Sequence, residues 1–407
     1  MKTGKCQTIR FLLVVSTLLI AGISQAKWHS GLAAMKEDSY QQGENSSKTV
    51  VTKKNVVIKK RTYRYIEYEK ISPDAIRLRY IVPKGEILVI PSEIDGCKVE
   101  EVGTEIQYVN IVKGKKVKKV IISKGIQTIK HDAFYGMNVE EVVLPKSLKY
   151  IEDFAFSGGC MLQRINLDSV EKIGFGAFLG CEYLKKIQLQ NERVVVESSA
   201  FSDCSRLEEI KWPQTIKGKF EGGCFEKTGI KKLKWPRIAD PIEKRFGAHM
   251  FTDCRNLERV EFPKNQKHIY IPANMFVGCE KLHKLVFPKG TGLVTYRSTP
   301  CAENYTKNVT TLEFRDAGTN VRGNKYRAEN GKWKYDFITV NKIIAPKNSK
   351  AVRYAKKAVC IKTFTKEWLK ELKKDSSLSD NYTREDAKAA KYRIQLFKEG
   401  KVRIQER

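Results

Sequence analysis

Five histidines could supply general bases or metal ligands in this chain of 407 residues. Imidazole acts as a base near neutral pH, and zinc sites hold histidine at a short fixed spacing from a second ligand. The sequence has no HExxH motif or comparable pair. The histidines are spread singly along the chain, at His29, His131, His249, His268 and His283. We therefore predict structural or solvent-facing histidines and no metal site.

Glycine-rich loops are the second pattern that could carry chemistry. Gly174, Gly176 and Gly180 have the spacing GxGxxxG, which differs from the dinucleotide fingerprint, and no long helix pattern follows them. The sequence also lacks GxSxG and GxxxxGK[ST]. Carboxylate pairs such as Glu208 and Glu209 fall at positions expected to be exposed and need no catalytic role. The sequence thus predicts a protein with no catalytic residues and no cofactor.

The cysteines do not form a disulfide framework. Of the ten in the chain, Cys6 lies in the charged leading segment, which leaves nine, an odd number that cannot all pair within one chain. No pair has CxxC spacing. Cys181, Cys204, Cys254 and Cys279 instead occupy one position of a repeating pattern. Since free cysteine is among the most buried residue types, we predict that these four lie in the core.

A small residue followed by phenylalanine recurs at a nearly constant interval. The clearest copies are Ala133-Phe134, Ala155-Phe156, Ala177-Phe178 and Ala200-Phe201, with Phe spacings of 22, 22 and 23 residues. Degenerate copies at Phe225, Phe251 and Phe276 follow at spacings of 24, 26 and 25 residues. Self-similarity at a period of this length is the sequence signature of a repeat architecture.

A second block after each phenylalanine predicts one short strand per repeat. Apolar residues follow the cysteine position at offsets 3, 6 and 8, as in Leu184, Ile187 and Leu189 after Cys181. The last two alternate with polar residues, which is the period of a strand with one buried face. One repeat cannot bury that face alone, so neighbouring turns must stack. The predicted fold class is a β-rich solenoid with one strand per turn of about 22–27 residues.

These blocks resemble the leucine-rich repeats of BspA-like surface proteins, whose turns read roughly LxxIxLPxxLxxIxxxAFxxC. Residues 86–96, EILVIPSEIDG, are similar to the family's entry segment. The segment IIAPKNSKAVRYAKKAVCIK from Ile343 resembles its closing unit, a last strand followed by a short helix. The resemblance spans most of the chain. It implies an exported protein that uses stacked leucine-rich repeats for adhesion or for recognition of extracellular partners.

The sequence divides into six predicted parts, with a β cap before the solenoid and a helical cap and tail after it. They are a signal peptide at 1–26, a flexible lead at 27–54, an N-terminal β cap at 55–101, the solenoid at 102–346, a C-terminal cap at 347–362 and a basic helical tail at 363–407. Two segments without the Ala-Phe landmark, 291–309 and 315–334, are predicted to be irregular loops.

The leading residues predict export. Lys2, Lys5 and Arg10 precede the apolar run 11–23, and small residues stand before a cut between Ala26 and Lys27. The run is shorter than the roughly 20 residues that a membrane span needs. We therefore expect a secreted or cell-surface protein without a membrane span in the mature chain.

The mature chain is strongly basic. Removing the three cationic residues of the signal peptide from the formal charge of +30 leaves +27. Such a charge attracts acidic partners, so an extracellular protein, an acidic glycan or a cell-wall polymer are candidate ligands. No specific nucleic-acid partner is expected, because Trp212, Trp235, Phe262 and Phe287 fall in the buried strand column rather than on a stacking surface. Nothing in the sequence predicts an oligomeric state.

Strand alternation predicts one candidate binding face. If Ile187 and Leu189 point inward, their neighbours and the matching residues of later repeats point outward. This outward set is Lys186, Gln188, Lys211, Lys232, Lys234, Arg259, Glu261 and Lys284. Two functions remain open: recognition of a defined extracellular partner by this face, or a wall-associated basic scaffold that docks to anionic polymers. A face that is merely solvated is a third possibility.

Most of the nine cysteines after Cys6 should carry free thiols. Mass spectrometry of the denatured, unreduced protein after alkylation should find most of them labelled, because the pattern places several in the core as separate thiols. Complete pairing of eight thiols would contradict this assignment.

Overall fold

The computed structural model describes most of the repeat region and both of its ends. The described residues are 51–54, 63–83, 85–103, 117–240, 242, 245–272, 274–296, 309–327, 333–338, 340, 342–357, 359–360, 400–401 and 403–406. All of them except Gly400 belong to one compact unit. The predicted signal peptide and residues 363–399 of the predicted tail lie outside the described residues.

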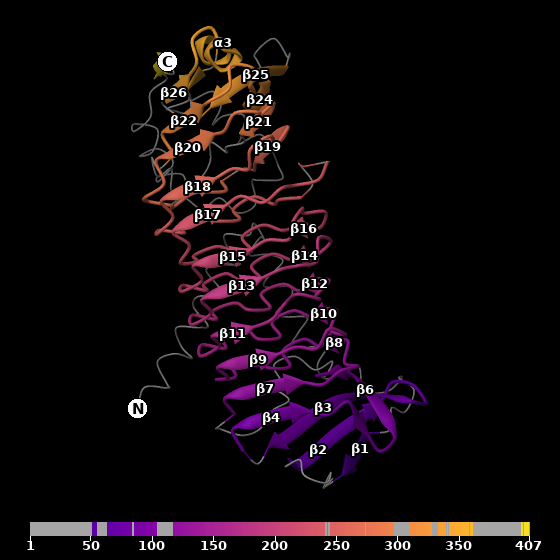
Figure 1. Cartoon of the computed structure of the whole chain (residues 1–407). Coiled ribbons are helices and arrows are strands. Elements are labelled where there is room, and N and C mark those ends of the chain that lie inside the picture. The colour runs from indigo at the N-terminus through magenta and orange to yellow at the C-terminus, as the bar shows by residue number, and fades with distance from the viewer. Residues whose placement is uncertain are drawn as a thin grey trace, which may run out of the picture. The chain divides into compact units, whose positions relative to one another are not determined.

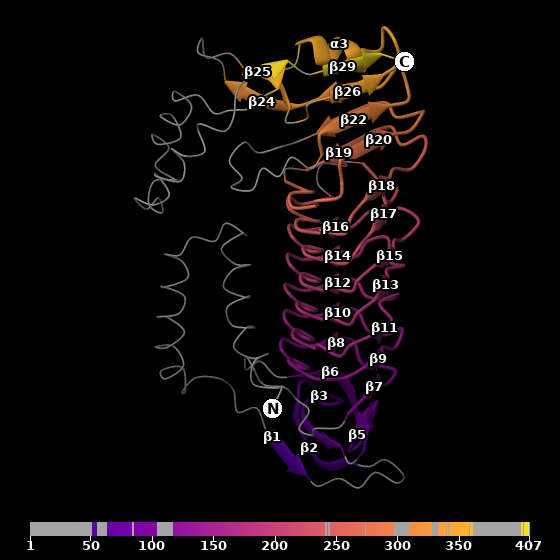
Figure 2. The same cartoon turned by 90° about the vertical axis from the view of Figure 1, so that its left-hand side faces the viewer.

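The described unit is a solenoid in which each turn contributes short strands to two columns (Figures 1 and 2). The first face holds β4 (Ile87–Ile90), β7 (Lys119–Ile122), β9 (Glu141–Val143), β11 (Arg164–Ile165), β13 (Lys186–Gln188), β15 (Glu209–Lys211), β17 (Lys232–Lys234), β18 (Arg259–Glu261), β20 (Lys284–Phe287), β22 (Thr311–Phe314) and β26 (Lys342–Ala345). The second face holds β6 (Cys97–Val102), β8 (Thr128–Ile129), β10 (Tyr150–Ile151), β12 (Lys172–Ile173), β14 (Val195–Val196), β16 (Lys219–Phe220), β19 (His268–Ile271), β21 (Leu293–Tyr296) and β23 (Asn320–Arg322). The predicted β-rich solenoid is confirmed, but the predicted single strand per turn is wrong, because most turns add a second short strand on the second face.

The phenylalanine landmarks form a continuous buried ladder between the two faces. Rings of consecutive turns from Phe134 to Phe225 stack with centroids 5.0 to 5.4 Å apart. Their backbones are also joined from turn to turn, as where the Phe178 N–H donates to the Ala200 carbonyl at 2.7 Å. The ring spacing is close to the spacing of paired strands, so stacked rings and paired strands share one repeat distance.

The cysteine column lies beside this ladder. Cys181, Cys204, Cys254 and Cys279 are fully buried, as predicted, and their thiols are free. Each Sγ donates to the carbonyl of the phenylalanine one turn earlier, for example from Cys204 to Phe178 at 3.3 Å. Burial raises the pKa of the Cys204 and Cys279 thiols. The column is therefore a hydrogen-bonded part of the core and not a reactive site.

Antiparallel strands cover the N-terminal edge of the stack. β2 (Tyr63–Lys70) pairs with β3 (Ala75–Pro83), and β3 pairs in parallel with β6 of the second face. β2 and β3 both lie within the N-terminal β cap predicted at 55–101, and β5 (Glu93–Ile94) adds a short antiparallel pair to β6. The last residues of the predicted flexible lead were wrongly assigned, because β1 (Val51–Lys54) pairs with β2. The alternation that predicts strands is too short to detect in these four residues.

The C-terminal end corrects two further predictions. Parts of the segments predicted as irregular loops are strands, since β21, β23 and β24 (Asn324–Arg327) lie within them. β21 and β23 continue the ladder of β19, which compensates for the missing landmark. The last residues of the predicted helical tail form β29 (Arg403–Glu406), which pairs with β26. Pairing at an open sheet edge has overridden the local helical composition there.

Other elements complete this end of the described unit. They are β25 (Trp333–Ile338), the helix α3 (Lys350–Lys357), β27 (Val359–Cys360) and β28 (Gly400–Lys401). The helix follows β26, as the resemblance of this segment to a closing unit implies, and Val352 of the helix packs into the core. No helix in the described part of the chain is long and apolar enough to cross a membrane.

A buried carboxyl interrupts the otherwise apolar surroundings of the ladder at Glu226. Only 3% of this residue is exposed, and its side chain approaches Lys227 at 3.4 Å. Burial raises its pKa above the ordinary 4.5, while Lys227 acts in the opposite direction and Asp203 and Asp253 add to the increase. The ionised form of Glu226 therefore opposes folding at neutral pH.

Replacing Phe178 with Ala should lower the free energy of unfolding by about 3 to 5 kcal/mol, because the substitution leaves a cavity between two stacked rings. Denaturant unfolding followed by circular dichroism measures this loss. Tyr150→Ala is the control, since Tyr150 is 43% exposed and should change stability little. Equal unfolding curves for the Phe178→Ala variant and the parent would contradict the ladder.

Replacing Glu226 with Gln should raise the melting temperature at pH 7.5. A carboxyl with a raised folded-state pKa contributes its full stability below the unfolded pKa and loses it as the pH rises through the folded pKa. The gain should therefore shrink towards pH 4, where both forms are largely neutral.

Asp316→Asn is the control of opposite sign for that pH series. Backbone hydrogen bonds from Gly290 and Gly318 lower the pKa of Asp316, so its stabilisation is present at neutral pH and lost in acid. This variant should melt below the parent at pH 7.5. A Glu226→Gln gain that does not depend on pH would rule out burial of the charge as its cause.

Candidate ligand-binding face

The eight residues of the predicted outward set all lie on the solvent side of the first face. In β15 and β17 the outer residues are exposed and the middle residue is buried, as strand alternation requires. Gln188 and Glu261 are half-buried, and the other six are exposed. The register places Lys232 beside Arg259 and Lys234 beside Glu261 on neighbouring strands. The structure thus brings these residues into one surface, which we call the basic face.

Most cations of the basic face have an acidic neighbour. Lys186 approaches Glu209 at 3.2 Å, and Glu261 lies within 3.0 Å of Lys232 and 3.1 Å of Arg259. Lys284 and Arg315 both approach Glu313, at 3.0 and 3.6 Å. These acidic residues partly neutralise cations that lie one strand apart, and they limit the repulsion between cationic side chains of successive turns.

Lys211 and Lys234 differ from these neighbours. Within the described residues neither forms an ion pair, and both are exposed. The nearby Lys186 lowers the pKa of Lys211, with Lys234 adding to the effect and Glu209 opposing it. Unneutralised positive charge is therefore concentrated at the middle of the basic face.

The strand ladder of the first face is interrupted at this place, as it also is between β11 and β13. β13 pairs with β15 and β17 pairs with β18, but no backbone hydrogen bond joins β15 to β17 in the described part of the chain. The Glu209 N–H and the Lys211 carbonyl form hydrogen bonds on the side of β13. The Lys231 carbonyl and the Trp235 N–H form hydrogen bonds on the side of β18. Since successive residues of a parallel strand direct their polar groups to opposite sides, those of Ile210, Lys232 and Lys234 face the interruption.

Two indoles lie at the interruption between β15 and β17. The Trp212 ring packs edge-on against Phe220 and Phe225, with centroids 5.3 and 5.7 Å apart. Trp235 packs edge-on against Phe246 at 5.3 Å and tilts against Phe262. The smaller rings at the same position in the next turns, from Phe262 to Phe314, stack at 5.0 Å. Two edge-on indoles in consecutive turns require more room than one strand spacing provides.

A groove of about 630 Å³ lies between β15 and β17, and we call it the Trp groove. Its walls include Lys211, Lys234 and Arg237, and its apolar lining is Ile210, Trp212, Pro213, Ile230, Leu233, Trp235 and Pro236. The Nε1 atoms of both indoles are buried without a hydrogen-bond partner among the described residues. A smaller hollow of about 310 Å³ extends from Lys211 and Trp212 to Gln188 and Gln190.

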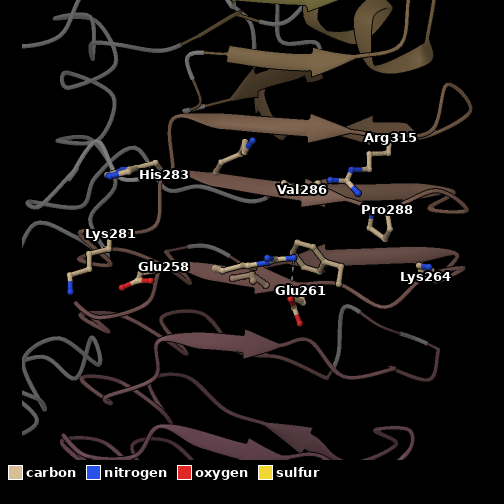
Figure 3. Close-up of a pocket in the computed structure, with 12 residues that line it drawn as sticks. Glu258, Glu261, Lys264, Lys281, His283, Val286, Pro288 and Arg315 are labelled. Atoms are coloured by element: carbon tan, nitrogen blue, oxygen red, sulfur yellow. Dashed lines mark ion pairs between the residues drawn. The ribbon is translucent and has the colours of Figure 1, made fainter. Parts of the chain in front are cut away.

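A second groove of about 700 Å³ crosses β18 and β20 (Figure 3). Figure 3 shows Lys264, Pro288 and Arg315 at one end of these strands and Lys281 and Glu258 at the other. Its central residues Arg259 and Lys284 are in the ion pairs given above. This groove therefore offers less uncompensated charge for its size than the Trp groove.

The described residues contain no group of three or more His, Cys, Asp or Glu that could hold a metal ion. The histidines are separate. His131 lies 3.1 Å from the buried Asp132, while burial lowers the pKa of His249, which contacts Asn274 at 3.2 Å. His268 contacts Thr295 across neighbouring strands at 2.9 Å. These contacts are structural.

Sequence reasoning placed the basic face but missed the Trp groove. Trp212 was predicted to be buried and is only half-buried, because the interrupted ladder leaves one side of its ring open. A signal for this was present: two consecutive turns carry Trp where others carry Leu or Phe, and the block that carries the second of them, TGIKKLKWP, is shortened.

A comparison with protein-family models agrees with this repeat architecture. The family model of the BspA type leucine rich repeat region matches in six copies, over residues 106–231 and 171–298. A leucine-rich repeat protein of T. pallidum is 25% identical, covers 56% of this chain and 91% of its own, and has a TM-score of 0.38. A leucine-rich repeat protein from Bacteroides ovatus is 18% identical, with 74% and 97% covered and a TM-score of 0.34.

The pneumococcal vaccine antigen PcpA is similar over 74% of this chain and 78% of its own, with 17% identity and a TM-score of 0.36. No curated protein matches the chain.

Proposed function

The chain is a BspA-like leucine-rich repeat protein, and we propose that it is exported and binds an extracellular partner through its basic face. The observation that carries the proposal is the pair of exposed cations without acidic partners, Lys211 and Lys234, at the middle of a surface built by repetition. Repeat scaffolds commonly present extended surfaces of this kind to ligands. The fold supplies the surface and its rigidity, and the side chains supply the preference for acidic partners.

Export is supported by the first 26 residues. They combine cations, an apolar run and small residues before Lys27, which is the composition of a secretory signal peptide. The free thiols do not oppose this proposal, because the described cysteines on the solenoid column are buried and separated from oxidants. We therefore propose a secreted or cell-surface location.

A second candidate is a basic scaffold that docks to anionic wall polymer without a defined partner. The formal net charge of +30 favours it. Binding through net charge alone would weaken steeply with salt and would depend little on which cations are removed. Binding through the basic face would instead weaken when cations of that face are removed and change little when cations elsewhere are removed.

Changing Lys211, Lys232 and Lys234 together to Glu should leave folding intact, because all three side chains are exposed, and should reduce capture of the ligand at least about tenfold. The measurement is a pull-down of the mature protein against host matrix, mucin and purified cell wall at low and high salt. A triple change of Lys124, Lys146 and Lys267 to Glu is the control, with the same charge change on exposed sites away from the basic face.

Equal loss with both triple variants would favour charge-only docking to anionic polymer. Capture that is unchanged in a folded Lys211, Lys232 and Lys234 variant would exclude the basic face. Absence of saturable capture from every source would contradict a binding function.

A further inference from the structure

We propose that β29 is a removable cap on β26, and that the edge of β26 beneath it is a strand-binding site for the same segment of a second copy of this chain. The cap opens and closes without unfolding the repeats. While it is closed, the chain occupies its own site. In the strand order this site lies beyond β20 and β22, outside the basic face.

β29 is the last strand of the first face and comes from the end of the chain. The order of its sheet is β17-β18-β20-β22-β26-β29, so among the described strands β26 is paired on both sides and β29 on one (Figure 2). Residues 361–399 lie between β27 and β28 in the sequence, and β28 leads directly into β29. The edge of β26 is thus closed by a segment that belongs to no repeat.

Few contacts hold β29 on the stack. It has four residues, which pair in parallel with Lys342 to Ala345 of β26. Its one apolar residue, Ile404, lies beside Ile343 and packs against the core. Ile404 is only half-buried, whereas Ile343 is fully buried, and a half-buried side chain gains less from leaving water. Segments with few buried apolar contacts are those that open locally in a folded protein.

The end of the stack stays closed without β29. β22 pairs with the other side of β26 at three positions. The core at this end contains Ile343 and Ala345 of β26 and three residues of α3, Ala351, Val352 and Ala355. Release of β29 therefore removes the pairing along one strand edge and one half-buried side chain, and the repeats keep their own contacts.

Release of β29 leaves a defined row of unpaired backbone groups on β26. The Lys342 N–H donates to the Thr310 carbonyl at 3.0 Å, on the side of β22. Successive residues of a parallel strand direct their polar groups to opposite sides, so Ile343 and Ala345 direct theirs towards β29. Unpaired N–H and C=O groups at a sheet edge are a template for another extended chain. A second copy of this chain supplies a strand that also places isoleucine beside Ile343.

Amide hydrogen exchange of the mature full chain tests whether the cap is removable. Ile404→Asp should speed exchange of the Ile343 and Ala345 amides at least about tenfold, because a carboxylate is costly to bury beside the core. The Lys342 amide, which is bonded on the side of β22, should change much less. Gln405→Asp is the matched control, since it adds the same charge at the neighbouring exposed residue and should leave all three amides unchanged.

Two results of the exchange experiment would overturn the proposal. Unchanged exchange at Ile343 and Ala345 in the Ile404→Asp variant would mean that β29 does not close this edge. Exchange that speeds equally at the amides of β22 and β26 would mean that β29 is an integral part of the stack and cannot leave it alone.

A labelled peptide tests whether the uncovered edge binds a strand from a second copy. The peptide carries residues 400–407, Gly-Lys-Val-Arg-Ile-Gln-Glu-Arg. Fluorescence anisotropy should show saturable binding to the Ile404→Asp chain, and the peptide should slow the Ile343 and Ala345 amides again. Binding to the parent should be at least about tenfold weaker, because its own strand competes at an effective concentration of roughly millimolar or more.

The control peptide exchanges the positions of isoleucine and the following glutamine. It keeps the composition and the charge but turns the isoleucine away from the core, so it should bind at least about tenfold more weakly. Equal binding of the two peptides would indicate attraction by charge alone and overturn the strand-binding site. Equal binding to the parent and the Ile404→Asp chain would place the peptide elsewhere, and absence of saturable binding to that variant would also contradict the site.

Discussion

The constraint on which the structure depends is the distance between successive turns. Paired strands lie about 4.8 Å apart, and no turn can bury its apolar face except against the next. The phenylalanine rings stack 5.0 to 5.4 Å apart from Phe134 to Phe225, so ring stacking and strand pairing stabilise the same spacing. The cysteine column fits because a thiol is small and each Sγ can reach a carbonyl one turn away.

Where the strands of the first face are not paired, the phenylalanine ladder still keeps successive turns at this spacing. The first face loses its strand pairing between β11 and β13 and again between β15 and β17, while the ladder at Phe201, Phe225 and Phe251 remains joined through backbone bonds. The loss of pairing is therefore local and leaves the stack intact. It also leaves a groove in which Lys211 and Lys234 lie beside the half-buried Trp212. A departure from the repeat thus shapes the surface of the first face at this place.

The periodic parts of the molecule could be predicted from the sequence because the same pattern of residues recurs in each repeat. The landmark at Phe178 and the alternation around Ile187 recur often enough to place the core, the strands and the outward residues. The strands β21 and β29 could not be predicted this way, since they belong to turns without the landmark and gain their pairing from a neighbouring strand. The Trp groove was missed for a related reason: its lining comes from two different turns, and the loss of pairing between them is not visible in any single repeat.

Repetition also sets the electrostatics of the basic face. A lysine that recurs at one position of the repeat is placed one strand from its own copy, so like charges accumulate unless an acid stands between them. Glu261 and Glu313 have that role in the later turns, each contacting two cations. Lys211 and Lys234 form no ion pair within the described residues, and Glu209 only opposes the lowering of the Lys211 pKa by Lys186. A carboxylate of the proposed partner at this place would neutralise these two lysines as Glu261 and Glu313 neutralise the cations of later turns, which is why the proposed function favours an acidic ligand.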